Sequence, residues 1–312
     1  MALIPVEQVS SLHYQVIVEG PYSCDLIFAD LNTFPRLGHE VFSTHFDITP
    51  GAAYNVAFGL HRLGVRVGWA ADFGNDFFSQ FVLNRAQDAG LDTSLFRQHP
   101  IPIRTVTSAF SFQADRAFVT YMDRIEPTSL IPLIETYRPP FLMFMHLKHD
   151  AAFHETARIA HQRGVAILMD CQETSLTLAD PRVGVAVQAI DIFAANASEA
   201  CQLTGAASVT EALARLSQLT PTVVIKMGTD GALAQRGDES VRVPALKVEV
   251  VDTTGAGDCF NCGFLYGLLR GYSLRECVRC GNICGGLAVT APGSQALPDA
   301  AELERRLKDY PE

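Results

Sequence analysis

A short run of small residues ends in an acid near the C-terminal end of the chain. The run is Gly255, Ala256 and Gly257, and Asp258 follows it directly. Small residues let the backbone pass close to a ligand, and at a helix start their N–H groups form a cradle for an anion. A carboxylate beside a bound anion is electrostatically unfavourable unless it takes part in the reaction. The chemistry that fits is removal of a proton from a hydroxyl group that attacks a phosphoryl group.

The flanking residues indicate that this loop joins a strand to a helix. Residues 248–251 are mostly apolar and β-branched, which predicts a strand. The residues after Asp258 carry apolar side chains at helical spacing as far as Gly271, which predicts a helix with Asp258 in its first turn. The alternative is a glycine-rich turn with an acidic helix start and no catalytic role.

An acid and two hydroxyl-bearing residues precede the small residues: Asp252, Thr253 and Thr254. With them, segment 252–258 resembles the C-terminal signature of the ribokinase-like (PfkB-type) carbohydrate kinases, and the resemblance extends from about residue 14 to about residue 297. It implies that Asp258 is the catalytic base and that residues 255–257 form the anion hole for the phosphoryl group. It also implies that Asp252 and Thr254 help to hold a monovalent cation, K⁺, beneath the anion hole.

The order of apolar segments agrees with the fold that the resemblance implies. From residue 141 onward, short apolar strands alternate with helical segments, which favours a parallel sheet covered on both faces. No linker rich in proline and glycine divides the chain, so we expect residues 1–312 to form a single kinase domain. The expected fold class is α/β, ribokinase-like: a central, mostly parallel sheet with helices on both faces and a small β-sheet lid.

Two segments with alternating polar and apolar residues, about 22–48 and 103–123, predict the strands of that lid. In the family, the lid closes over the sugar and often pairs with the lid of a second subunit, which implies a homodimer. Closure has a physical purpose in a kinase, because it excludes the water that would otherwise accept the phosphoryl group. The alternative is a surface hairpin with no gating role.

Three N-terminal residues resemble the sugar-binding residues of the family. Asp25 corresponds to a carboxylate that accepts hydrogen bonds from two sugar hydroxyls, a task that suits an acceptor-only group. Gly51 and Asn55 match the glycine and asparagine of the N-terminal signature, in a segment, 51–63, whose spacing predicts a helix. Without the resemblance, Asp25 is an acid entering a turn and Asn55 a polar residue at a helix start.

Departures from the family pattern bear on the acceptor. Ala52 stands where some kinases of phosphosugars carry a lysine, which argues against a phosphorylated acceptor. Ribokinases have an acidic sugar contact after the strand that corresponds to residues 141–147, where this chain has His146, Lys148 and His149. Ribose therefore fits poorly. Lys148 is either a partner for a carboxylate on an acidic sugar or an ordinary exposed lysine after a strand.

The resemblance also implies a site for ATP. Asn196 and Glu199 follow an apolar strand and resemble the Asn-x-x-Glu motif, in which the glutamate orients Mg²⁺ largely through water. The alternative is a helix capping box formed by the same two residues. The other candidate nucleotide contacts lie at the end of a strand near glycines, or at the family's adenine pocket: Lys226, Gly228, Gly231 and Asn282.

The composition excludes several classes of protein. Hydrophobic residues make up 48% of the 312 residues, which supports a sizeable core, and the formal net charge is −10. Such a surface repels nucleic acid, whereas ATP needs only a local positive field. No apolar run approaches the ~20 residues that span a bilayer, and the N-terminus has no evident secretory signal. We therefore expect a cytoplasmic protein that binds neither nucleic acid nor membranes.

Five of the eight cysteines lie close together in the sequence: Cys259, Cys262, Cys277, Cys280 and Cys284. Two Cys-x-x-Cys pairs resemble a zinc ribbon, but ribbon ligands lie on turns, whereas these cysteines follow helical spacing. A capping box at residues 273–276 starts the second helix. We therefore interpret them as small apolar residues where two helices pack.

These observations predict an ATP-dependent kinase that transfers the γ-phosphoryl group of MgATP to a primary hydroxyl of a small carbohydrate. The glycine motifs of Rossmann oxidoreductases and of P-loop kinases are both missing. Two alternatives stay open: a nucleoside kinase of the same fold, and a non-catalytic sensor of a sugar or nucleotide. The complete loop with Asp258 argues against the sensor, because a sensor gains little from a base.

Overall fold

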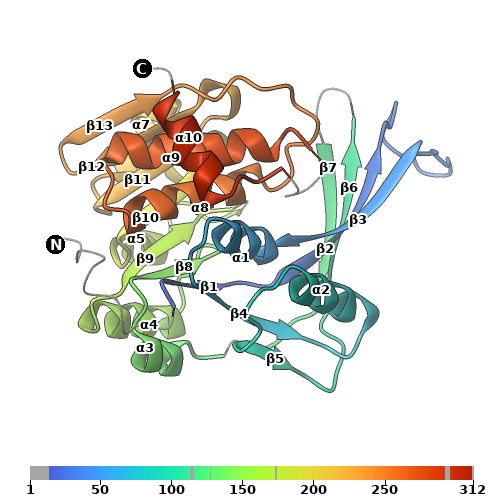
Figure 1. The fold of residues 1–312 in the computed structure, drawn as a ribbon, viewed down its shortest axis with the longest axis horizontal. Helices are drawn as coiled ribbons and strands as arrows, with labels where there is room; N and C mark the ends of the chain where they lie inside the picture. Colours follow the sequence, from blue (N-terminus) through green and yellow to red (C-terminus); the bar gives the residue numbers. More distant parts are fainter. Residues whose placement is uncertain (1–13, 113–115, 127, 173, 292–295, 311–312) are drawn as a thin grey trace.

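Nine strands form a central sheet in the order β13-β12-β11-β10-β9-β8-β1-β4-β5 (Figure 1). The computed structural model describes residues 14–112, 116–126, 128–172, 174–291 and 296–310. The strands of this sheet are β1 (Val16–Glu19), β4 (Val67–Phe73), β5 (Phe96–Gln98), β8 (Phe141–Phe144), β9 (Ala166–Asp170), β10 (Ile192–Asn196), β11 (Thr222–Lys226), β12 (Ala232–Arg236) and β13 (Glu239–Val243).

The strands from β11 to β5 run parallel, and β12 and β13 add an antiparallel edge. Within the parallel part, Val18 of β1 lies opposite Met143 on one side and Trp69 on the other, and all three are buried. This confirms the predicted, mostly parallel sheet. The carboxyl ends of the parallel strands meet at one edge, which is where ligands bind in open α/β sheets.

Helices cover both faces of the central sheet, as predicted. One hydrophobic cluster packs α1 (Ala53–Arg62), α2 (Phe77–Asp88), α8 (Ala256–Leu269), α9 (Leu274–Ala288) and α10 (Ala300–Lys308) on one face. A second cluster packs α3 (Ile131–Tyr137), α4 (Ala151–Gln162), α5 (Pro181–Gln188), α6 (Ala197–Thr204) and α7 (Val209–Leu216) on the other. None of the helices in the described ranges combines the length and the apolar character needed to cross a membrane.

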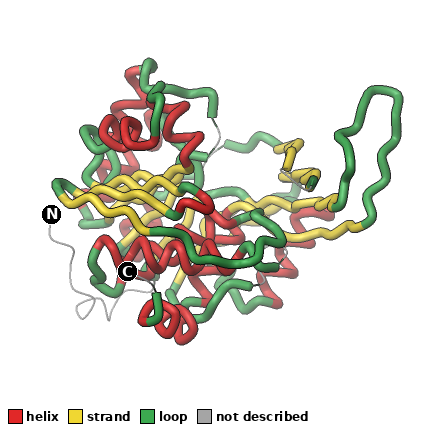
Figure 2. The backbone as a smooth tube through the Cα atoms, turned by 90° about the horizontal axis from the view of Figure 1, so that it is seen from above, coloured by secondary structure: helices red, strands yellow, loops and turns green. Residues whose placement is uncertain are grey.

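Four further strands form a second sheet beside the first, called the small sheet below, in the order β3-β2-β6-β7 (Figure 1). They are β2 (Tyr22–Ala29), β3 (His45–Ala52), β6 (Thr105–Ser111) and β7 (Arg116–Met122). The two segments predicted for a lid thus pair with each other, and β3 continues beyond the predicted limit at residue 48. Loop 30–44 joins β2 to β3 and projects from the sheet (Figure 2).

The two faces of the small sheet differ in character. The register puts Asp25 of β2 opposite Thr49 and Thr107, so these three side chains share one face with Ile27 and Ala109. Asp25, Ile27 and Ala109 are buried, which identifies this as the inner face. The other face carries aromatic and aliphatic side chains that are partly exposed, and we call it the outer face.

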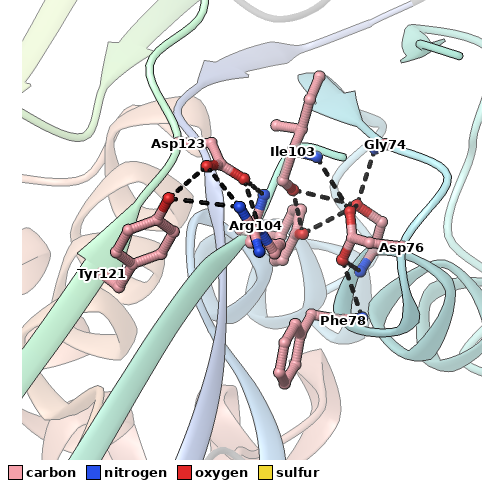
Figure 3. Close-up of polar contacts among 9 residues, drawn as sticks. Gly74, Asp76, Phe78, Ile103, Arg104, Tyr121 and Asp123 are labelled. Atoms are coloured by element: carbon pink, nitrogen blue, oxygen red, sulfur yellow. Dashed lines mark hydrogen bonds and ion pairs between the residues drawn. The ribbon is translucent and has the colours of Figure 1, made fainter. Parts of the chain in front are cut away.

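Carboxylates hold the base of the small sheet (Figure 3). Asp76 caps α2 and also accepts a hydrogen bond from the backbone N–H of Ile103 at 3.0 Å, just before β6 begins. Arg104 and Asp123 then tie β6 to β7, with 2.8 Å between Nε and Oδ2, and the Tyr121 hydroxyl donates to the same carboxylate at 2.6 Å. The hairpin β6–β7 is therefore fixed at the end that joins the rest of the chain.

Two predicted elements were wrong in type or extent. Residues 248–251 form an irregular connection and not a strand, and Val250 and Val251 are 53% and 62% exposed. The sheet ends at β13, so this segment pairs instead with the end of α9, where Val251 N–H donates to the Val289 carbonyl at 2.7 Å. The helix predicted from Gly51 begins at Ala53, because β3 extends through the two residues before it.

Candidate active site

The loop of small residues lies at the N-terminus of α8, as the sequence predicted. Gly255 is the N-cap and has a left-handed φ of +71°, which glycine adopts without strain, and α8 begins at Ala256. The first N–H groups of a helix have no partner within it and can bind an anion. Of these, the Ala256 N–H donates to the Thr253 carbonyl at 3.3 Å in this structure. A Cβ on Gly257 would lie 3.2 Å from Lys226 Nζ, so an ammonium group stands beside this turn.

Asp258 lies in the first turn of α8 and is in contact with Asn55 of α1. Asn55 Nδ2 donates to Asp258 Oδ2 at 3.2 Å. The pKa of Asp258 is raised to about 7, by burial first and then by the charge of Asp170, while the Asn55 hydrogen bond and the charge of Lys226 oppose the shift. A carboxyl group with a pKa near neutrality suits a general base, because it accepts a proton readily at working pH.

Asp25 and Gly51 lie against each other on the inner face of the small sheet. A Cβ at position 51 would lie 2.1 Å from Asp25 Oδ2, so a larger residue would displace this carboxylate. Ser23 Oγ donates to Asp25 Oδ1 at 2.5 Å. Burial raises the pKa of Asp25 to about 6, the Ser23 hydrogen bond opposes the shift, and the charge of Asp252 adds to it.

Asn55 has a polar atom without a partner. Its Oδ1 is buried and makes no hydrogen bond within the described part of the chain, although its Nδ2 is bound to Asp258. Buried polar atoms are normally satisfied, so an unpaired acceptor beside a candidate base points to a ligand donor such as a hydroxyl group. The negative charge of Asp25 also raises the pKa of Asp258, so the two carboxyl groups act on each other electrostatically.

A buried ion pair supports the anion loop from the sheet side. Lys226 Nζ, at the end of β11, lies 3.0 and 3.1 Å from the carboxylate oxygens of Asp170, at the end of β9. Asn261 of α8 also donates to Asp170, at 2.7 Å. Burial alone would lower the pKa of Lys226, but the charges of Asp170 and Glu199 outweigh it and raise the pKa. Lys226 therefore stays positively charged beside the loop.

The sequence did not single out Asp170 or Asn261. The sequence does contain a signal for Asp170, because this acid ends an otherwise apolar strand. Lys226 ends another strand of the sheet in the same way. Carboxyl ends of parallel strands meet at one edge, so such residues come together. Asn261 follows Asp258 by three residues, which puts both on one face of a helix.

Asn196 and Glu199 form the capping box that the sequence offered as an alternative. Asn196 Oδ1 accepts from the Glu199 N–H at 2.9 Å, and Glu199 Oε2 accepts from the Asn196 N–H at 2.7 Å. The negative charge of Glu199 nevertheless raises the pKa of Lys226. The capping role is therefore confirmed, and the role in orienting Mg²⁺ stays a prediction.

The remaining candidate nucleotide residues lie around the start of β12 and on α9. Gly231 has φ of +85°, and a Cβ there would lie 2.0 Å from the Val243 carbonyl oxygen, so glycine is required for packing. Gly228 has φ of +57° and open space around it. Asn282 donates to the carbonyls of Val243 and Pro244, at 3.2 and 2.9 Å, and thereby holds the chain after β13. Contacts of these residues with ATP stay predictions.

The turn before the anion loop contains the two residues predicted to hold a monovalent cation. Asp252 Oδ1 accepts from the N–H of Thr254 at 2.9 Å and from its hydroxyl at 2.7 Å. Arg116 of β7 reaches this turn from the small sheet, with Nη1 2.8 Å from Asp252 Oδ1. It also donates to the hydroxyls of Thr253 and Thr254. Sequence reasoning did not single out this arginine.

A cavity of about 450 Å³ lies between the inner face of the small sheet and residues 251–252. That size is within the range of small-molecule sites. It is lined by Ile27, Ala29, Asp30, Leu31, Asn32, His45, Asp47, Ser111, Phe112, Val251 and Asp252. Carboxylates therefore dominate its charged lining.

The basic residues after β8, at positions 146–149, include a lysine that pairs with a carboxylate of the protein itself. Lys148 Nζ pairs with Glu19 Oε1 at 3.2 Å, at the end of β1. Burial lowers the pKa of His146 to about 4, with the charge of Lys148 adding to the effect, so this imidazole is neutral near pH 7. The lysine considered for binding an acidic sugar thus already has a carboxylate partner.

The cysteine-rich segment forms two packed helices, as interpreted from its spacing. Cys259 and Cys262 on α8, and Cys277, Cys280 and Cys284 on α9, are buried. The helices approach closely, because a Cβ on Gly263 would lie 2.2 Å from the Cys280 carbonyl oxygen. Burial raises the pKa of each of these five thiols, which keeps them protonated and unreactive.

Known proteins resemble the chain over most of its length. A family model described as pfkB family carbohydrate kinase matches residues 20–301. Aminoimidazole riboside kinase of Salmonella typhimurium is 30% identical over 283 residues, which cover 83% of this chain and 88% of that protein. A 2-dehydro-3-deoxygluconokinase of Bacillus subtilis is 31% identical over 287 residues, which cover 85% of this chain and 88% of that protein.

Solved structures agree in fold. Arabidopsis thaliana ribokinase, complexed with ribose and ATP, matches with a TM-score of 0.80 at 18% identity, covering 95% of this chain and 99% of that one. Aminoimidazole riboside kinase from Salmonella enterica, complexed with aminoimidazole riboside and an ATP analog, matches with a TM-score of 0.72 at 29% identity, covering 94% and 99%. The predicted ribokinase-like α/β fold is confirmed.

Proposed function

The chain belongs to the PfkB family of carbohydrate kinases, and from this premise we propose that it transfers the γ-phosphoryl group of MgATP to a primary hydroxyl group of a small carbohydrate. The observation that carries the proposal is Asp258, a carboxyl group with its pKa raised to about 7 at the N-terminus of α8. Asn55 touches this carboxyl on one side and offers an unpaired acceptor atom, and Lys226 stands beside the same turn.

In the proposed reaction, Asp258 accepts the proton of the acceptor hydroxyl group. The oxygen of that hydroxyl group bonds to the γ-phosphorus at the same time. The bond from that phosphorus to the bridging oxygen breaks, and ADP leaves with the electron pair. The N–H groups of residues 255–257 and the Lys226 ammonium group stabilise the charge on the transferring phosphoryl group. Asp25, Gly51 and Asn55 orient the acceptor.

The residues at the edge of the sheet suit Mg²⁺ that arrives with ATP. Mg²⁺ prefers carboxylate oxygens and retains several waters, and it supplies charge neutralisation for the phosphates. Asp170 and Glu199 both act on the pKa of Lys226, so two carboxylates lie near the ammonium group that we assign to phosphate. We propose that Glu199 orients the ion through water, and that Lys226, Gly228, Gly231 and Asn282 border the nucleotide.

The carboxylates on the inner face of the small sheet favour a neutral, hydroxylated acceptor. Asp25 lies on this face, and Asp30, Asp47 and Asp252 line the cavity beside it, which Asp25 and Asp258 do not line. Ionised carboxylates only accept hydrogen bonds, so they bind hydroxyl groups and repel carboxylate or phosphate groups. Sugars, polyols and nucleosides suit this acidic face. A nucleoside acceptor is the second candidate, because a relative at 30% identity is named as an aminoimidazole riboside kinase.

The experiment that tests the function is an ADP-release assay with MgATP and K⁺ against free sugars, polyols, nucleosides and sugar acids. One strong neutral acceptor would support the proposal, and a nucleoside as the best acceptor would favour the second candidate. Preference for a sugar acid would contradict the charge argument. Binding of ATP without phosphorylation of any acceptor would favour a sensor.

We expect K⁺ to raise turnover several-fold over a choline salt of equal ionic strength. Asp252 and Thr254 offer a carboxylate and a hydroxyl oxygen directly before Gly255, the donor type that hard cations prefer. Arg116 donates to the same two oxygens, so the cation and the guanidinium would compete for them. A cation there would stabilise negative charge in the adjacent anion hole. Steady-state rates in the two salts measure the effect, and identical rates would rule the cation out.

We also propose that the small sheet is a lid and that its outer face pairs with a second copy of the chain. Phe28, Phe46 and Phe110 form an aromatic group there, with ring centroids 5.1 and 5.8 Å apart, and Val119 is 60% exposed. Contiguous exposed apolar surface of this kind commonly marks an interface.

Light scattering should therefore give about twice the chain mass of 34.0 kDa. Val119→Asp should weaken the dimer by about 2 kcal/mol, some thirtyfold in dissociation constant, because it buries a charge in an apolar interface. Val185→Asp is the matched control, since Val185 is 52% exposed on α5. A monomeric wild-type protein at assay concentration would contradict the dimer.

A further inference from the structure

Arg116 connects the small sheet to the turn that precedes the anion loop. It is the first residue of β7 and pairs with Ser111 of β6, on the inner face of the sheet. Its guanidinium lies 2.8 Å from Asp252 Oδ1 and also donates to the hydroxyls of Thr253 and Thr254. The side chains of Arg116 and Asp252 are 19% and 11% exposed, so this contact is largely shielded from water.

The planar guanidinium group is suited to hold a turn in one shape. It offers several donors in a fixed fork, and here they go to three consecutive residues, 252–254. Phe118 lies on the same strand and face, and its ring centroid is 5.6 Å from the guanidinium carbon. Such a cation–π contact restricts the arginine further.

The turn that Arg116 contacts leads directly into the helix start. Asp252 Oδ1 accepts from both the N–H and the hydroxyl of Thr254, and the Thr253 carbonyl accepts from the Ala256 N–H at 3.3 Å. Gly255 follows in its left-handed conformation. A change in the position of Asp252 would therefore change the direction in which the first N–H groups of α8 point.

The contact also places the positive charge of Arg116 against the negative charge of Asp252. The Asp252 carboxylate raises the pKa of Asp25, so it acts electrostatically on the candidate acceptor site. Without a counter-charge, it would also repel an anion held at residues 255–257. Arg116 supplies that counter-charge from the small sheet, and it does so only while the sheet lies against the loop.

We propose that Arg116 is a positioning residue that couples the placement of the small sheet to the shape of the anion loop. The inference rests on the proposed kinase function for its catalytic consequence, but the coupling itself does not. When the sheet lies over the acceptor, Arg116 orders residues 252–257 and neutralises Asp252. When the sheet moves away, the loop loses this support, and the phosphoryl group is not stabilised while water has access.

The test compares Arg116→Ala and Arg116→Lys with Arg104→Ala in the full-length chain. Arg104 is the matched control, because it pairs with Asp123 and stacks on Tyr121 (Figure 3). It lies at the opposite end of the β6–β7 hairpin from Arg116. Two readouts are needed: steady-state kinetics with MgATP and the best acceptor, and hydrogen exchange of residues 250–257 without any substrate.

Arg116→Ala should lower kcat about 10²-fold with the KM for ATP unchanged, because a misplaced loop affects the transferring group more than ATP binding. It should also speed exchange in residues 250–257. Arg116→Lys should recover part of both effects, since lysine keeps the charge but not the fork. Arg104→Ala should leave exchange in that loop unchanged.

Loop exchange in Arg116→Ala equal to that of the wild type would overturn the proposal, as would a kcat no lower than in Arg104→Ala. If the wild type phosphorylates no acceptor, the kinase proposal fails and exchange alone decides the coupling. If the alanine variant does not fold, the comparison between Arg116→Lys and the wild type decides in the same way.

Discussion

Asp258→Asn should lower kcat by about 10²–10⁴-fold and leave ATP binding intact, because it removes the proposed base without changing the size of the side chain. Asparagine retains the contact with Asn55, whose Nδ2 now donates to Asp258 Oδ2 at 3.2 Å. Stopped-flow or coupled kinetics measure the loss, and calorimetric titration with ATP tests whether the nucleotide site is preserved. Turnover close to that of the wild type would refute the assignment.

The pH dependence provides a second readout on the same carboxyl group. The pKa of Asp258 is raised to about 7, so the base is protonated below that pH and ionised above it. The kcat/KM of the wild type should therefore rise with pH through about 7 and level off in the alkaline range. The asparagine variant should lose this rise, because position 258 no longer titrates. A wild-type profile flat from pH 5 to 9 would contradict a base with this pKa.

Folding stability should fall with rising pH over the range in which activity rises. A carboxyl whose pKa is raised in the folded state destabilises the fold once the pH exceeds its unfolded value, since the buried group must then ionise at a cost. For Asp258 the loss of stability runs from about pH 4 to about pH 7. The neutral asparagine avoids this loss, so the variant should melt at the same temperature as the wild type or higher at pH 8. A loss of activity with unimpaired folding identifies a functional residue.

The local signals in the sequence were sufficient for the loop and for most of the architecture. Alternating apolar strands and helices favour a parallel sheet whatever the strand order, and small residues before Asp258 indicate a helix start. The strand predicted at residues 248–251 failed because β-branched residues report only a local preference. The segment does not pair with the edge of the sheet at β13, and it lies exposed instead.

Local sequence patterns could not identify residues whose roles depend on partners far away in the chain. Arg116 and Asp252 are separated by 136 positions, and an arginine at a hairpin has no local mark that distinguishes it from a solvent-exposed one. Asp170 is different, since its position at the end of an apolar strand was informative. Its pairing with Lys226 required the strand order, which puts β9 and β11 on either side of β10.

The buried ion pair of Asp170 and Lys226 should contribute strongly to the stability of the fold. The side chains are 4% and 12% exposed and lie 3.0 Å apart. Asp170→Asn leaves a buried ammonium group without its counter-charge, which we expect to lower the free energy of unfolding by about 3–5 kcal/mol. Lys226→Met leaves the opposite charge unpaired and should have a similar effect. It should also lower kcat by about 10²–10³-fold through loss of charge at the phosphoryl group.

The double variant Asp170→Asn/Lys226→Met distinguishes pairing from packing. Removing both charges leaves neither member of the pair as an unpaired buried ion, so the double variant should be more stable than either single variant, while its kcat should stay as low as that of Lys226→Met. Lys148→Met is the matched control, because Lys148 pairs with Glu19 at 3.2 Å but is 28% exposed, and we expect a change below about 1 kcal/mol. Urea unfolding at pH 7.5 of the four variants and the wild type measures these changes. Equal losses in Asp170→Asn and in the control would show that the buried pair has no special weight, and additive losses in the double variant would show that the two residues act separately.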